Sequence, residues 1–478
     1  MRRAIFLLAL SSVISSACGL KVPADSSSRL SSGEGAAVEA AEAGAEGASV
    51  SAEAGGAQAG GAAAAAGGPA AKAAAGKAGE GPAGVSGAKL FPNDTEGVTD
   101  TQVTICSHIP MTGAAPIPRH PGRFGKFYFD YVNKELKGIH GRNVKFVTLD
   151  DKYYPAGALQ AVNDCKRNGT FLYAGAAGTD QIVAVGKWAA ANKVPYLAGP
   201  ASVKDIGNIP QVKMVGPDYE SQHVLLADYL IKNAQQLTGK AKPVFGMLRV
   251  NSPFFTAGHD VFVEELRKRG FSLAVDKQVE KDENQFTDVM LEMEQKGVDI
   301  INNFTTPNIW IKLLKQNNNP NYKPLFTAVS PAAGYNIIAA ALADSNAKAI
   351  LFHHFNPPYD HTDRNLPWAG DITEFRRIFD KYSPEKCEAN DPLCPDDFDY
   401  SAYLAAKGLE RILRQAGRDL TRTKVWTLLD TYKENPAQVG PACALDFTRD
   451  KGRGAHAVNV YRLDGAKWKL LAACIDRV

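Results

Sequence analysis

The chain has 478 residues, of which 45% are hydrophobic, and carries a formal net charge of +3 at pH 7. This length allows two ordinary domains and an additional segment. A charge so close to neutral argues against nucleic acid as a partner.

The amino terminus is typical of an exported protein. A basic start precedes a short apolar stretch, which cannot span a bilayer but suits a secretory signal. Residues 15–19, SSACG, resemble a lipobox, in which the cysteine is diacylated after cleavage, with Ser15 where leucine is usual. We predict a lipoprotein signal peptide at residues 1–18 that leaves Cys18 lipidated and membrane-anchored. The alternative is an ordinary signal peptide cut near Ala17, which would leave the protein secreted or periplasmic.

Residues 19–97 form a low-complexity segment of alanine, glycine, serine and glutamate, with almost no large apolar side chains. Such a segment cannot bury enough surface to offset the entropy cost of ordering it, so we expect a disordered linker. A linker of this kind suits a tether between a lipid anchor and a mobile domain.

From Val103 onward, short β-rich runs alternate with segments of helical periodicity. The expected strands lie at 103–109, 144–149, 170–175, 194–198, 243–250, 271–279, 298–304, 324–328, 349–352, 458–463 and 467–472. The expected helices lie at 124–137, from Pro155, from Asp180 as the cap, and at 221–236, 257–269, 284–296, 371–382, 399–416 and 423–432. Alternating strands and helices are typical of a parallel, doubly wound α/β sheet, and two series of similar size predict two lobes.

The loops that follow the strands border the ligand crevice in sheets of this kind. The first strand ends in a turn at residues 110–113, so Ser107 and Thr112 are predicted ligand contacts. Asp150 and Asp151 end the second strand. They could be an acid pair, but a strand-exit turn that caps the next helix is the preferred interpretation.

The same strand exits carry a family resemblance. The segments PMTGAA at 110–115 and GIHGRNVKFVTLDDKYYPAGALQAV at 138–162 resemble the opening of type I periplasmic binding proteins. The closest branch is the branched-chain amino-acid (leucine/isoleucine/valine) group, which delivers solutes to ABC transporters. The resemblance covers residues 98–478 and implies two α/β lobes joined by three crossover strands. The implied crossings lie near Gly216, Phe355 and Val439, with lobe 1 at 98–218 plus 356–438 and lobe 2 at 219–355 plus 439–478.

The resemblance also implies a solute site in the cleft between the lobes. Thr179 matches a serine whose hydroxyl binds the ligand carboxylate, and Ser202 matches a hydroxyl residue with the same role. The backbone N–H of Ala201 is available beside Ser202, since the preceding proline has none. In the second lobe, Phe255 matches an aromatic wall and Thr305 lies near another ligand contact.

The chain departs from the resemblance at residues 327–336. Amino-acid binders of this family hold the ligand ammonium with a second-lobe carboxylate, and this stretch contains no acid. A buried ammonium without a counter-charge is costly. An α-amino acid is therefore in doubt as the ligand, and a carboxylate, an amide or an aromatic or hydrophobic solute fits equally well.

Six cysteines remain when Cys18 is set aside for lipid, and an even number in an exported chain suggests disulfides. The preferred pairs are Cys387–Cys394, which closes a short loop, Cys443–Cys474, which would join two late strands, and Cys106–Cys165. The last two residues could instead be buried thiols. No cysteine spacing resembles a zinc site.

Catalytic and metal sites are not expected. His353 and His354 precede acids and a histidine at 360–363, but adjacent histidines on a strand point to opposite faces, so we expect no metal. The chain contains no recognisable nucleotide-binding loop and no nucleophile–base pair. We therefore expect neither a cofactor nor an enzyme.

These features predict an extracytoplasmic, lipid-anchored substrate-binding protein of an ABC importer. Its two lobes would close by a hinge motion over a small polar or amino-acid-like solute, and the closed form would dock on the permease subunits. The alternative is a surface ligand sensor or partner-binding module with the same fold and no transport role. An extracellular enzyme is the least favoured reading.

Overall fold

The computed structural model describes residues 89–113, 125–175, 178–317, 319–329, 348–353, 368–384, 386–387, 394–436, 439, 442–464 and 467–476. The chain divides into residues 1–83 and 84–478, and all the described residues belong to the second unit. The expected signal peptide at residues 1–18, the lipidation site Cys18 and the linker up to residue 88 lie outside the described residues.

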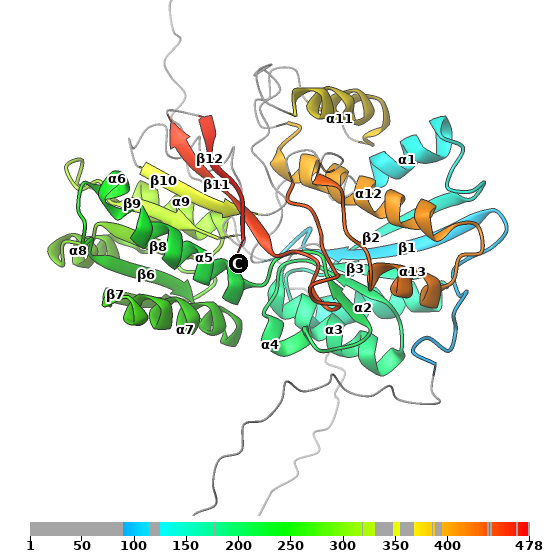
Figure 1. Cartoon of the computed structure of the whole chain (residues 1–478), viewed down its shortest axis with the longest axis horizontal. Helices are drawn as coiled ribbons and strands as arrows, with labels where there is room; N and C mark the ends of the chain where they lie inside the picture. The colour runs from blue at the N-terminus through cyan, green and yellow to red at the C-terminus, as the bar shows by residue number, and fades with distance from the viewer. Residues whose placement is uncertain are drawn as a thin grey trace, which may run out of the picture. The chain divides into compact units, whose positions relative to one another are not determined.

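Five described strands form a parallel sheet in the order β2-β1-β3-β4-β5. Figure 1 labels β1, β2 and β3 of this sheet. They are β1 (Gln102–Ile109), β2 (Asn143–Asp150), β3 (Leu172–Gly175), β4 (Tyr196–Ala198) and β5 (Val212–Met214). The connecting helices are α1 (Lys126–Glu135), α2 (Pro155–Arg167), α3 (Thr179–Asn192) and the short α4 (Val203–Ile206). Because parallel crossovers are right-handed, the reversal of direction after β2 puts α1 on one face of the sheet and α2 and α3 on the other.

A second sheet has the order β12-β11-β10-β9-β8-β6-β7. Its parallel strands are β6 (Phe245–Val250), β7 (Leu273–Val279), β8 (Ile300–Phe304), β9 (Leu325–Ala328) and β10 (Lys348–His353), and its antiparallel strands are β11 (Ala457–Asp464) and β12 (Lys467–Asp476). The helices of this series are α5 (Tyr219–Lys232), α6 (Ala234–Thr238), α7 (Pro253–Lys268), α8 (Thr287–Gln295) and α9 (Pro307–Lys315). The prediction of two parallel α/β series is confirmed.

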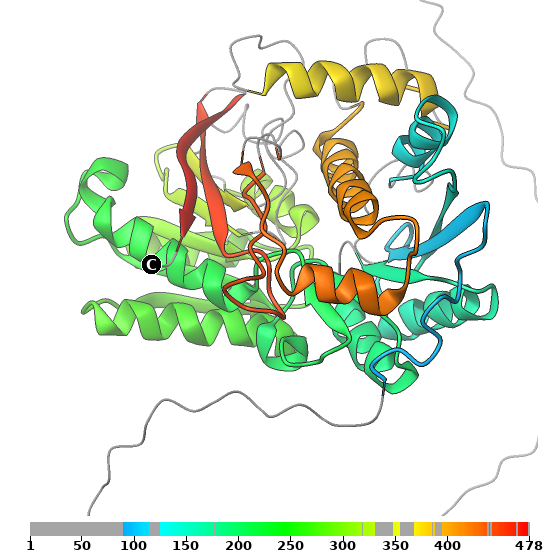
Figure 2. The ribbon, with the colours of Figure 1, turned by 45° about the vertical axis from the view of Figure 1, so that its right-hand side comes forward.

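Three late helices pack on the first sheet although they lie between β10 and β11 of the second sheet in the chain. They are α11 (Ala369–Tyr382), α12 (Asp397–Ala416) and α13 (Arg422–Leu429). In Figure 2 the gold α11 and the orange α12 lie beside the cyan α1. Asp396 and Asp399 form a reciprocal capping box that starts α12, whose apolar face then enters the core.

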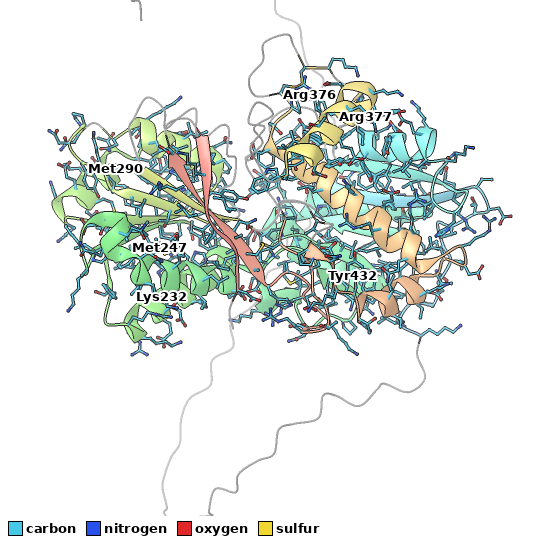
Figure 3. The ribbon with its side chains drawn as sticks, turned by 45° about the horizontal axis from the view of Figure 1, so that its top comes forward. Lys232, Met247, Met290, Arg376, Arg377 and Tyr432 are labelled. Carbon is cyan, nitrogen blue, oxygen red and sulfur yellow. A yellow bond between two sulfur atoms is a disulfide. The ribbon has the colours of Figure 1, made fainter. Side chains whose placement is uncertain are left out.

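Each sheet has its own buried core. Figure 3 marks the core of the second sheet with Met247 and Met290 and that of the first with Tyr432. The first described residues join the first core as well. Phe91, in the stretch assigned to the linker, is fully buried, and its ring centroid lies 5.6 Å from that of Trp426.

Two segments that cross between the sheets run side by side. Met214, at the end of β5, donates its N–H to the carbonyl of Gly452 and accepts the N–H of Gly454. Leu445 and Phe447, expected in lobe 2, belong to the core of the first sheet. The chain therefore returns to the second sheet just before β11. The lobe boundaries as a whole remain a prediction.

Several local expectations were wrong. The helix α7 begins at Pro253, four residues earlier than predicted, because proline at the first helical position suits its fixed φ. The helix α3 begins at Thr179 with Gly178 as its N-cap, so Asp180 lies inside the first turn and does not cap it. The structure also contains α4, β5 and α9, which were not predicted.

The structure contains three disulfides, which pair the cysteines as the sequence analysis preferred. Their Cα–Cα distances are 6.2 Å for Cys106–Cys165, 5.3 Å for Cys387–Cys394 and 5.5 Å for Cys443–Cys474. Cys106–Cys165 joins β1 to α2 inside the core. Cys443 precedes β11 and lies outside any strand, so the third bond ties a loop to β12, not one strand to another.

In the part of the chain that the structure describes, no helix combines the length and apolarity needed to cross a bilayer.

Candidate functional site

Each parallel sheet has one position where the strand order reverses, and crevices for ligands open at such positions beyond the carboxyl ends of the strands. In the first sheet the reversal lies between β1 and β3, and in the second it lies between β6 and β8. The loops after these four strands are therefore the places to examine. Thr179 follows β3, Phe255 follows β6 and Thr305 follows β8.

Asp150 organises the exits of β1 and β2. Its carboxylate accepts the Thr112 hydroxyl at 2.6 Å and the N–H groups of Met111, Thr112 and Lys152. Burial raises the pKa of Asp150, but these hydrogen bonds outweigh it and hold the pKa below its ordinary value. Thr112 is thus occupied in a turn, and Ser107 is buried inside β1, two residues before its end.

Asp151 belongs to a fully buried network of three side chains. Its Oδ2 lies 2.8 Å from Nδ1 of His108, and Nε2 of His108 lies 2.8 Å from the Tyr196 hydroxyl. Gly175 borders this network, because a Cβ there would overlap Tyr196 Oη and lie 2.6 Å from His108 Nε2. Neither Asp150 nor Asp151 caps α2, whose N-cap Tyr154 has no side-chain cap, so the capping interpretation was wrong.

Tyr219, the first residue of α5, gathers the predicted contacts of the first sheet. Its hydroxyl lies 3.4 Å from Thr179 Oγ1 and donates to the carbonyl of Pro200 at 3.3 Å. Its N–H donates to the carbonyl of Ala201 at 3.3 Å. Ser202 is fully buried and donates its hydroxyl to Oε1 of Glu220 at 2.6 Å. Burial raises the pKa of Tyr219 well above its ordinary value, so the phenol stays protonated.

Tyr219 also contacts the exits of the second sheet. Its ring centroid lies 5.5 Å from that of Phe304, which lies 4.7 Å from that of Phe255. Thr305 follows Phe304 and is fully buried, with its hydroxyl donated to Asn303 Oδ1 at 3.0 Å. Thr179 and Phe255, from different sheets, are therefore linked through two aromatic rings.

His223 lies one helical turn after Tyr219 and supports the same wall. Its ring centroid lies 4.3 Å from that of Phe304, and its Nδ1 lies 2.8 Å from the Tyr219 carbonyl. The ring is fully buried, and burial lowers its pKa to about 4. At neutral pH His223 is therefore uncharged, and its Nδ1–H donates to the backbone carbonyl of Tyr219 and holds the start of α5 in place.

A charged pair also connects the two sheets. Lys281, two residues after β7, places Nζ 2.8 Å from Oδ2 of Asp180, which is in the first turn of α3. The same ammonium lies 5.6 Å from the ring centroid of Tyr153. Tyr153 has a positive φ of 60°, in a turn where its N–H donates to Asp151 Oδ1 at 2.9 Å. This backbone conformation is uncommon for a residue other than glycine and sets the direction of the ring.

Part of the expected site lies outside the described residues. Within residues 327–336, the stretch without an acid, Thr327 is buried in β9 and residues 330–336 lie outside the described residues. His353 ends β10, and the rest of the histidine–aspartate group, residues 354–363, also lies outside them. Among the residues that are described, no three His, Cys, Asp or Glu side chains are grouped so that they could hold a metal ion.

The comparisons with known proteins identify the family. Residues 102–467 match the family model described as periplasmic binding protein. The chain belongs to the periplasmic binding protein family. Among curated proteins, no sequence matches this chain. Proteins of this family are extracytoplasmic and bind small solutes.

Solved structures show that this periplasmic binding protein has the type I fold. A fatty acid ABC transporter substrate-binding protein from Thermomonospora curvata is 16% identical, with a TM-score of 0.65 over 82% of this chain and 96% of that one. A branched-chain amino acid ABC transporter protein from Thermus thermophilus with bound valine is 17% identical, with a TM-score of 0.63 over 79% and 97%. A leucine binding protein from Thermotoga maritima is 16% identical, with a TM-score of 0.61 over 78% and 98%.

Two residues of this periplasmic binding protein's candidate site, Tyr219 and Lys281, were not predicted from the sequence, and Tyr153 was predicted only as part of the strand-exit segment 150–154, one of the first places expected for ligand contacts. Tyr219 opens the helix after a crossing, two residues before the start predicted for that helix, and no role was assigned to it. Lys281 lies in a turn that reads as a solvated loop. Tyr153 follows two acids, and the only local signal was its place in a strand-exit loop. Their roles depend on how the two sheets meet, which no spacing along the chain reveals.

Proposed function

We propose that the chain is the solute-binding component of an ABC importer, which captures a small solute between the carboxyl edges of its two sheets. The observation that supports this most directly is the contact of Thr179 from the first sheet with Tyr219 and, through Phe304, with Phe255 from the second. A solute held there would touch both lobes, so its binding would favour the closed arrangement.

The chemistry of these exits suits a small guest with one polar end. Thr179, the backbone beside Ala201 and Ser202 supply hydrogen-bonding groups on one side, and Phe255 with Phe304 supplies an apolar wall on the other. Apolar walls with a few convergent polar groups are typical of small-molecule sites. Ser107 and Thr112 stay proposed contacts at the adjacent exit of β1.

The finer parts of the proposal concern the surroundings. Export with lipidation of Cys18 would hold the protein at the outer face of the membrane, and residues 19–88 would allow the lobes to reach a permease. The proposed lobes hinge at the crossings near Gly216 and before β11. No catalytic role is proposed.

Calorimetric titration of the purified protein against a solute library tests this function, together with small-angle scattering with and without each hit. We expect a hit to bind with a stoichiometry of one and to reduce the radius of gyration. Thr179→Ala should weaken binding roughly tenfold, the effect of one hydrogen bond to a charged group, while Thr373→Ala, at an exposed position of α11, should not. A library without hits, or hits that are indifferent to Thr179, would refute the proposed site.

A further inference from the structure

Several buried polar groups near the strand exits have no hydrogen-bond partner among the described residues; three of them can donate a hydrogen bond, whereas Asn302 Oδ1 in β8 is an acceptor. Gln181 Nε2 and Asn303 Nδ2 are buried N–H donors with no hydrogen-bond partner among the described residues, and the Ser252 hydroxyl is buried in the same condition. Gln181 lies in the first turn of α3, Asn303 near the end of β8, and Ser252 just after β6. A buried donor without an acceptor costs about 1–3 kcal/mol, so these groups call for a guest that accepts hydrogen bonds.

The carboxylates at the same exits already have partners. Asp151 binds His108, Glu220 accepts the Ser202 hydroxyl, and Asp180 binds Lys281. None of these three acids is left to balance the ammonium group of a ligand. Lys281 would also repel a cationic guest, because its ammonium pairs with Asp180, the residue that follows Thr179 in the chain.

Lys281 is held in a way that allows a second partner. Its side chain and that of Asp180 are 31% and 29% exposed, so their pairing contributes little to stability. The Tyr153 ring supports the ammonium from another direction and would keep it in place when a second carboxylate binds. A ligand anion could therefore join Asp180 at Nζ, while Asp180 stays paired with Lys281.

We propose that Lys281 determines specificity in this site, so that the protein selects solutes that carry a carboxylate and no ammonium group beside it. This rests on the proposed function and names its substrate class. The side chains of Gln181, Asn303 and Ser252 donate hydrogen bonds to the anion's oxygens, and Lys281 supplies the opposite charge from the second sheet. An anion held by both Lys281 and Gln181 would favour the arrangement in which Lys281 and α3 lie close together, which couples recognition to closure.

Matched ligand pairs test this inference on the full-length protein. The probes are 4-methylpentanoate with leucine and 3-phenylpropanoate with phenylalanine, since each pair differs only by the ammonium group. Calorimetry should show that at least one carboxylate binds roughly tenfold or more tightly than its amino-acid partner. Lys281→Met should weaken that carboxylate by a similar factor and reduce the preference. Asp180→Asn, which removes the competing carboxylate, should strengthen it and steepen its dependence on salt.

The matched control is Lys277→Met, because Lys277 lies in β7 and pairs with Glu292 within the second sheet's own layer. It removes the same charge and should leave both affinities unchanged. If the amino acids bind as tightly as the carboxylates, if Lys281→Met acts no more than Lys277→Met, or if neither carboxylate binds, the inference fails. If the library then yields a neutral or cationic hit, the proposed solute-binding function stands and only the preference for carboxylates is refuted. A library with no hits would refute both the solute-binding function and the preference for carboxylates.

Discussion

Arg453, on the returning crossing, places Nη1 3.3 Å from Oδ2 of Asp218, the residue that caps α5 on the outgoing crossing. Asp218 is only 3% exposed and also accepts the N–H and hydroxyl of Ser221. The pair therefore fastens the two crossings to each other at the point where the lobes would pivot.

Replacing this arginine should loosen the hinge. Arg453→Met removes a charged partner from a buried carboxylate, so we expect the free energy of unfolding to fall by about 1–2 kcal/mol. Thermal melts measure the loss, and scattering should show a broader range of lobe separations. Arg267→Met, which removes an exposed pair within α7, should change neither. Equal melts for the two variants would contradict a hinge role for Arg453.

The buried Asp151–His108–Tyr196 network predicts a second effect. Tyr196→Phe leaves Nε2 of His108 buried without its partner, which should cost about 1–3 kcal/mol of stability. Chemical denaturation measures this value. The control is Tyr154→Phe, because Tyr154 is 55% exposed and should be replaceable without loss. Equal free energies of unfolding for the Tyr196→Phe and Tyr154→Phe variants would show that the network does not stabilise the fold.

His223 predicts a dependence of stability on pH. Its pKa in the folded protein is about 4, below the ordinary value of 6.5, because burial disfavours the charged ring. Between these values the unfolded chain binds a proton that the folded protein does not, so stability should fall as the pH drops from 6.5 to 4 and then level off. The expected loss is about 3.5 kcal/mol, the difference in pKa times roughly 1.4 kcal/mol per unit.

The measurement is a series of unfolding curves from pH 7.5 to pH 4 for the native protein and for His223→Gln. The glutamine keeps a hydrogen-bond donor but cannot take up a proton, so this component of the pH dependence should disappear. A slope that survives His223→Gln would assign the effect to other groups.

The disulfides should differ in their contribution. Cys106–Cys165 spans 59 residues and Cys387–Cys394 spans 7. If the bonds act by restricting the unfolded chain, loop closure makes the longer one worth about 2 kcal/mol more. The double variants Cys106→Ala with Cys165→Ala and Cys387→Ala with Cys394→Ala test this by denaturation. Equal losses would show that strain or local packing outweighs loop length.

Much of the fold could be predicted because its strands are short apolar runs bounded by glycine and proline. The predicted strand at 103–109 and the helix from Pro155 lie within one residue of β1 and α2. The helix α9 was missed although Pro307 begins it and Ile309, Trp310 and Leu313 bury one face. Proline after a strand is common in loops, so this segment was interpreted as a loop. The helical spacing of the apolar residues that follow Pro307 indicates a helix instead.

The site was predicted less completely. Thr179 and Phe255 lie where the two sheets approach, since strand-exit loops at a reversal of strand order border the crevice. Tyr219 and Lys281 gain their partners only when separate parts of the chain meet. Their contacts span 40 and 101 residues, so no local pattern could indicate them.

The crowding at Gly175 limits how solute preference can evolve. A side chain at the end of β3 has no space until both Tyr196 and His108 move or become smaller, so a new recognition group there needs more than one substitution. The intermediate with the smaller residue would be the less stable protein. Changes in what the protein recognises should therefore arise at strand exits other than that of β3.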